Sequence, residues 1–77
     1  MPMHSIIDLL NEIRAQERPE IVNSIRPELD AIAAAANRGD HAVVATAGAA
    51  AADGAARLGA DGTAHALYTT SQKALLG

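Results

Sequence analysis

Apolar residues recur with a helical period through the first segment of the chain. They are Ile6, Leu9, Leu10 and Ile13. Spacings of three and four residues place side chains on one face of an α-helix. Ser5 is a residue type that caps helix starts, and Pro19 pushes the residue before it out of helical backbone. The pattern therefore predicts an amphipathic helix over residues 5–17.

A second apolar stripe follows Pro19 and continues almost to Gly39. Its members are Ile21, Ile25, Leu29, Ile32 and Ala36. Proline is favoured at the first position of a helix, but Pro27 lies inside the stripe, where it removes a hydrogen bond and crowds the preceding turn. We expect helices over 19–26 and 27–38, joined either by a kink or by a true break. Gly39 can end the second helix as a left-handed cap.

An alanine-rich segment makes up most of the second half. Ala accounts for 19 of the 77 residues, and 17 of these lie between positions 31 and 66. Alanine is the strongest helix former but buries little apolar surface. Asp40 can cap a helix over 40–58 and Thr63 a last helix over 63–76. The sequence therefore predicts an all-α fold: a single domain over residues 1–77, built as a small bundle of four to five short helices with no strands.

Two glycines, Gly48 and Gly54, lie inside the predicted 40–58 helix. Each costs about 1 kcal/mol relative to alanine at such a position. Either the helix tolerates them, or small residues around Gly48 and Ala52 form a smooth face that a second helix backbone approaches closely. On another side of this helix Asp53 and Arg57 are four residues apart, which favours an ion pair.

Composition limits the classes of function. The chain has no Cys, which excludes disulfides and thiolate metal sites. A net charge of −3 with scattered Arg and Lys argues against nucleic acid as a partner. No apolar run is long enough to span a membrane, and Asp8 interrupts the first one, so we expect neither a membrane segment nor a signal peptide. These features predict a soluble protein, located in the cytoplasm or within a larger assembly.

Side chains that could support catalysis are few. The three histidines, at positions 4, 41 and 65, lie far apart in the sequence, and no two have the spacing of metal ligands. The segment from Gly48 to Gly54 lacks the Lys-Ser/Thr that ends a phosphate-binding loop. Neighbouring carboxylates such as Glu28 and Asp30 occupy positions typical of solvated helix faces. We expect no catalytic residue, no cofactor and no metal site.

These patterns predict a non-enzymatic helical interaction module. Its apolar stripes exceed what so small a chain can cover, so we expect a homo-oligomer or a small structural subunit docked on a larger assembly. A phage virion or another bacterial or phage assembly suits the small size of the chain. It also suits the five Arg against one Lys and the abundant Ala, Gly and Asp, which are typical of a GC-rich coding sequence. The residues expected at the interface are Ile6, Leu10, Ile13, Val44, Gly48, Ala51, Ala52, Ala55, Leu58, Tyr68 and Leu75. The alternative is a small regulator or inhibitor that binds a host protein or, with less support, DNA through a helix-turn-helix.

Overall fold

Short connections join five helices in residues 3–76, the part of the chain that the computed structural model describes. The helices are α1 (Met3–Gln16), α2 (Pro19–Ser24), α3 (Arg26–Arg38), α4 (His41–Arg57) and α5 (Asp61–Leu75). No strand occurs among these residues. The predicted all-α class is therefore confirmed. The helix bounds lie within one residue of those expected, except that α1 and α5 each begin two residues earlier and α2 ends two residues earlier, at Ser24.

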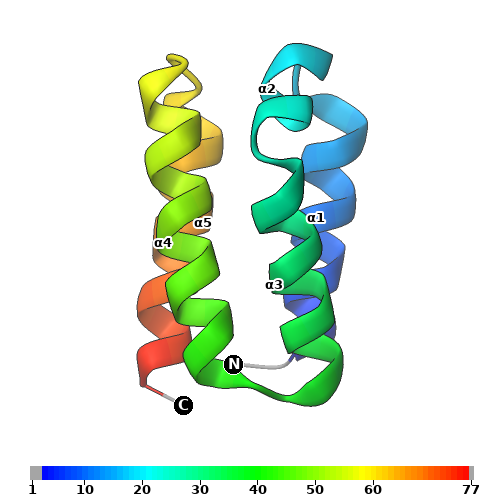
Figure 1. Ribbon diagram of the computed structural model, residues 1–77, viewed down its shortest axis with the longest axis vertical. Coiled ribbons are helices and arrows are strands. Elements are labelled where there is room, and N and C mark those ends of the chain that lie inside the picture. Colours follow the sequence, from blue (N-terminus) through cyan, green and yellow to red (C-terminus); the bar gives the residue numbers. More distant parts are fainter. Residues whose placement is uncertain (1–2, 77) are drawn as a thin grey trace.

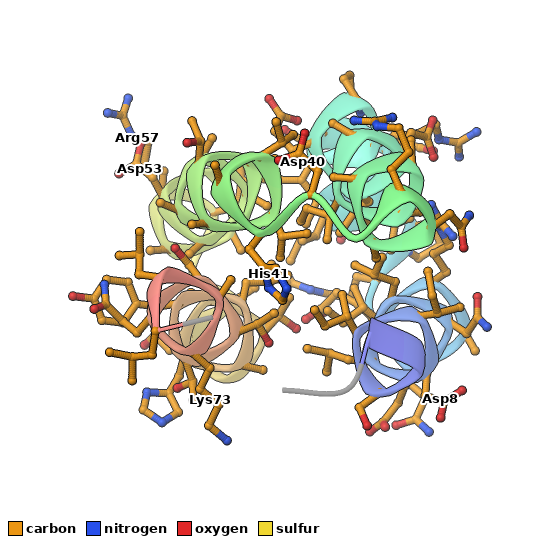
Figure 2. The ribbon with its side chains drawn as sticks, turned by 90° about the horizontal axis from the view of Figure 1, so that it is seen from below. Asp8, Asp40, His41, Asp53, Arg57 and Lys73 are labelled. Atoms are coloured by element: carbon orange, nitrogen blue, oxygen red, sulfur yellow. The ribbon has the colours of Figure 1, made fainter. Side chains whose placement is uncertain are left out.

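The four longer helices form an up-down bundle along the 30 Å axis of the molecule (Figure 1). Seen from below, α4 and α5 lie side by side on one side, and α3 and α1 lie on the other (Figure 2). The contact between α4 and α5 is the most extensive, followed by that between α3 and α4. The edge between α1 and α5 closes the bundle and is packed least tightly.

Pro27 breaks the helix instead of kinking it. Ile25 leaves helical geometry with φ −106° and ψ 11°, and α3 begins at Arg26 with Pro27 in its first turn. The break is compact, because the Ile25 N–H still donates to the Ile21 carbonyl at 3.1 Å. The apolar stripe continues across it, since Ile25 itself is buried in the core. Of the kink and the break that the sequence left open at Pro27, the structure shows the break.

The ends of α3 and α4 follow the predicted capping chemistry. Gly39 adopts left-handed backbone with φ 69° after α3. The Asp40 carboxylate then accepts a hydrogen bond from the Val43 N–H at 3.2 Å and so caps the start of α4. Both residues perform the roles expected of them, which fixes the direction in which α4 leaves α3.

Two predicted helix starts are wrong. Helix α1 already includes Met3, so Ser5 lies within the helix and is not its N-cap. Helix α5 begins at Asp61 with Ala60 at the N-cap, two residues before Thr63. The turn is shorter than expected because Gly59, with φ 81°, lets the Ala60 N–H reach back to the Ala55 carbonyl at 2.9 Å. Helical backbone resumes directly after this cap.

One hydrophobic core unites all five helices. Its largest fully buried apolar side chains are Ile6, Leu10, Ile21, Ile25, Leu29, Ile32, Val44 and Leu67. The radius of gyration of 10.9 Å is close to the value of about 11.5 Å typical of folded domains of this length. The single chain therefore covers the two apolar stripes of its first half, whereas Leu58, Tyr68, Leu75 and Leu76 remain exposed.

Candidate functional site

The predicted interface residues divide into two groups. One group is buried within the chain's own core or between its helices: Ile6, Leu10, Ile13, Val44, Gly48, Ala51, Ala52 and Ala55. The other group stays accessible, with Leu58 45% exposed, Tyr68 53% exposed and Leu75 65% exposed. Within this fold, the second group offers most of the side-chain surface that another protein can contact.

The small face around Gly48 is where two helix backbones meet. A Cβ atom at Gly48 would lie 3.2 Å from the Ser71 Cβ and 3.6 Å from the Leu67 carbonyl oxygen. The Ser71 hydroxyl also donates to the Ala45 carbonyl at 2.6 Å. The close-packing interpretation is therefore confirmed, and the helix that approaches α4 there is α5 of the same chain.

The outer side of the α4–α5 pair carries an apolar groove. It has a volume of about 420 Å³ and will be called the α4–α5 groove. Its lining residues are Ala49, Ala52, Asp53, Ala56, Ala64, His65 and Tyr68. Ala52 and Ala64 are buried, whereas Ala49 and Ala56 are exposed. The groove exists because alanines reach too short a distance to fill the space between two helix surfaces.

Tyr68 stands on the α5 wall of this groove. It is the one aromatic residue of the chain, yet it lies outside the core. Leu75 follows seven residues later, and two helical turns bring it to the same side of α5. A lone exposed apolar residue is ordinary on a protein surface. Two large ones on the same side of one helix, with Tyr68 on the wall of an apolar groove, are typical of a surface that binds another protein.

Charged residues border the same face. Asp53 and Arg57 form the predicted ion pair at 3.0 Å, and both are largely exposed. They point away from the bundle at the outer corner of α4 (Figure 2). An ion pair so exposed contributes little to stability. Its charges therefore remain free to interact with a molecule that approaches this face.

A second, more polar groove of about 520 Å³ follows the loosely packed edge between α1 and α5. There the Glu17 carboxylate accepts hydrogen bonds from the Thr63 hydroxyl and, at 2.9 Å, from the Arg18 N–H. The Thr63 bond, followed by the Arg18 N–H, holds the pKa of Glu17 below its usual value. This contact ties the end of α1 to the first turn of α5. Sequence reasoning missed it, because no local pattern links residues so far apart.

The histidines do not come together. His41 is half-buried at the start of α4, and Figure 2 shows it pointing toward the middle of the bundle end. His65 is exposed on the wall of the α4–α5 groove, and the side chain of His4 lies outside the described residues. Among the described side chains, no group of three or more His, Asp or Glu could hold a metal ion. None of the five helices is both long enough and apolar enough to cross a membrane.

The chain matches no family model, no curated protein and no solved structure with which it was compared. Fold and surface geometry are therefore the basis for a functional proposal. On that basis the α4–α5 groove is the candidate site.

Proposed function

We propose that this protein is a non-enzymatic helical interaction module that binds another protein chain through the α4–α5 groove. The observation that carries the proposal is the placement of Tyr68, the chain's one aromatic side chain, half-exposed beside an apolar groove. Tyrosine is enriched among the residues that dominate binding energy at protein interfaces, because its ring offers apolar area and its hydroxyl a hydrogen bond.

The rest of the groove supports the same proposal. Exposed alanines on the α4 wall allow a partner's backbone to approach closely, as Gly48 does for α5 inside the molecule. Asp53 and Arg57 supply a polar rim, and such rims surround apolar interface centres in known complexes. The bound chain can belong to a homo-oligomer or to a larger assembly, including a virion.

A small regulator or inhibitor of one protein is the second candidate. The observation that favours it is the self-sufficient core, because a chain that folds alone can meet its target as a free monomer. The two candidates share the α4–α5 groove as the contact surface. They differ in whether the partner is a structural assembly or a single protein that is controlled.

Site-specific photo-crosslinking tests the proposal. Tyr68 is replaced by a photo-reactive phenylalanine analogue in the full chain, and the protein is irradiated in its native cells. We expect discrete adducts from position 68. The same analogue at Asp8, which is exposed on α1 at the far corner of the bundle (Figure 2), serves as the matched control and should give none. Equal adducts from both positions, or none from either, would refute the assignment of this surface.

A further inference from the structure

We infer that the partner seated on the α4–α5 groove is a second copy of this chain, related by a two-fold axis that runs parallel to the groove. The inference rests on the proposed function and adds the identity of the partner. It is carried by the arrangement of charges and of large and small side chains on the two walls.

The register between α4 and α5 determines which residues lie at the same height. Ser71 lies beside Gly48 and donates to the carbonyl of Ala45. Because the two helices are antiparallel, following α4 forward from this point and α5 backward brings Asp53 level with His65. The two residues also line the same groove from opposite walls.

A two-fold axis parallel to the groove exchanges its walls without changing height. The α4 wall of one copy then faces the α5 wall of the other, and Asp53 of each copy lies opposite His65 of the other copy. The same register brings Arg57, one turn beyond Asp53, to about the height of Asp61, one turn before His65, although neither residue lines the α4–α5 groove itself. A carboxylate thus faces an imidazole, whose ring N–H can donate a hydrogen bond to it, and this polar contact occurs once on each side of the two-fold axis, as self-association requires.

The same two-fold axis also makes the shapes of the two facing surfaces complementary. Tyr68 projects from the α5 wall, and the register places it close to the height of Ala49 on the α4 wall. In the two-fold arrangement each tyrosine ring lies over the exposed alanine surface of the other copy. A large side chain over a small one, repeated twice, is the packing found between helices in bundles.

The area of the α4–α5 face determines how tightly two copies are expected to bind each other. Helices of 17 and 15 residues extend about 22 to 25 Å, and a pair of them offers a face about 20 Å wide. Each copy would bury roughly 450 Å², and the total of about 900 Å² lies below the range of stable specific interfaces, among weak and transient ones. The structure therefore predicts a weak dimer, half-formed at a concentration on the order of 100 µM.

Sedimentation equilibrium of the full chain at neutral pH and low salt tests the inference through a charge exchange. In His65→Glu, two carboxylates of different copies face each other, and in Asp53→Arg an arginine faces His65. Each variant alone should dimerise roughly 5- to 20-fold more weakly than the unaltered protein. An equimolar mixture of the two should associate more strongly than either alone, because the arginine introduced in one copy then faces the glutamate introduced in the other.

Three further variants complete the test. Tyr68→Glu should weaken dimerisation by more than about tenfold, since it removes the apolar contact. Asp8→Arg changes the net charge as Asp53→Arg does, but lies at the far corner of the bundle, and should dimerise like the unaltered chain (Figure 2). Melting curves should show all variants folded, because Asp53, His65, Tyr68 and Asp8 are exposed.

Each outcome decides the inference. A chain that stays monomeric up to about 1 mM, or a mixture that associates no better than its components, overturns it. The crosslinking experiment then judges the proposed function separately. An adduct between position 68 and a different protein would keep the α4–α5 groove as the contact surface with another partner, whereas a chain that neither dimerises in solution nor gives any adduct would remove both proposals.

Discussion

Replacement of Gly48 by leucine probes the closest approach between helices in this bundle. A Cβ at this position lies 3.2 Å from the Ser71 Cβ and 3.5 Å from the Ser71 Cα. Ordinary carbon–carbon contacts are about 3.5 to 4.0 Å. The α5 backbone stands directly behind Ser71, so the clash cannot be relieved by rotating one side chain.

The cost follows from two opposing effects. Loss of a helical glycine gains about 1 kcal/mol of helix propensity, whereas overpacking of a filled core costs about 1 to 3 kcal/mol and at times more. For Gly48→Ala the two nearly cancel, because only the Cβ must be accommodated. For Gly48→Leu the remaining carbons must separate α4 from α5. We expect the free energy of unfolding to fall by about 2 to 4 kcal/mol, a large fraction of the roughly 4 to 12 kcal/mol available to a domain of this length.

Urea unfolding followed by circular dichroism measures this loss. The matched control is Gly62→Leu, because nothing lies within 4 Å of a Cβ there and the backbone needs no left-handed angle. Gly62 lies in the first turn of α5, and its substitution should change stability by less than about 0.5 kcal/mol. Equal unfolding midpoints for Gly48→Leu and the unaltered chain would show that α4 and α5 do not meet as closely as described.

Two further predictions concern the core and the link between α1 and α5. Leu29 is fully buried, so Leu29→Ala should lower the free energy of unfolding by about 2 to 5 kcal/mol in the same urea assay; a loss below about 1 kcal/mol would contradict its central position. Thr63→Val removes the hydroxyl that holds the pKa of Glu17 low, so an NMR titration should show that pKa rising toward its usual value. A lowered pKa stabilises the fold above the unfolded value of about 4.3. The stability difference between Thr63→Val and the unaltered chain should therefore be present at pH 7 and shrink as the pH falls through the pKa of Glu17 in the folded state; a difference that is the same on both sides would contradict the linkage.

Local chemistry determined how much of the fold could be read from the sequence. Gly39 and Asp40 were predictable because a cap depends on the conformation and hydrogen bonds of its immediate neighbours. The outcome at Pro27 was not, since a kink and a break preserve the same apolar stripe and differ only in the geometry of Ile25. Thr63 looked like a cap from its position, but its hydroxyl is used by Glu17, 46 residues away. No periodicity in the sequence indicates the contact between Thr63 and Glu17.

The candidate site was predictable in composition but not in location. Hydrophobic periodicity identified the stripes, and it assigned Val44, Gly48 and Ala52 to an interface without indicating which helix would cover them. The structure places α5 against Gly48, and this close contact has a consequence for the outer side of the α4–α5 pair. Because Gly48 and Ser71 hold α4 and α5 so close together, no space for an aromatic ring remains between the two helices.

The position of Tyr68 follows from that spacing. Its ring lies on the outer surface beside alanines that are too short to cover it. The alanines of α4 therefore have two effects: on the inner side they bring α5 into close contact, and on the outer side they leave a shallow groove with an uncovered tyrosine. A larger residue in place of Gly48 would push α5 away from α4 and would also change the shape of the outer groove. For this reason we expect self-association and stability to fall together in Gly48→Leu, whereas in Tyr68→Glu self-association falls alone.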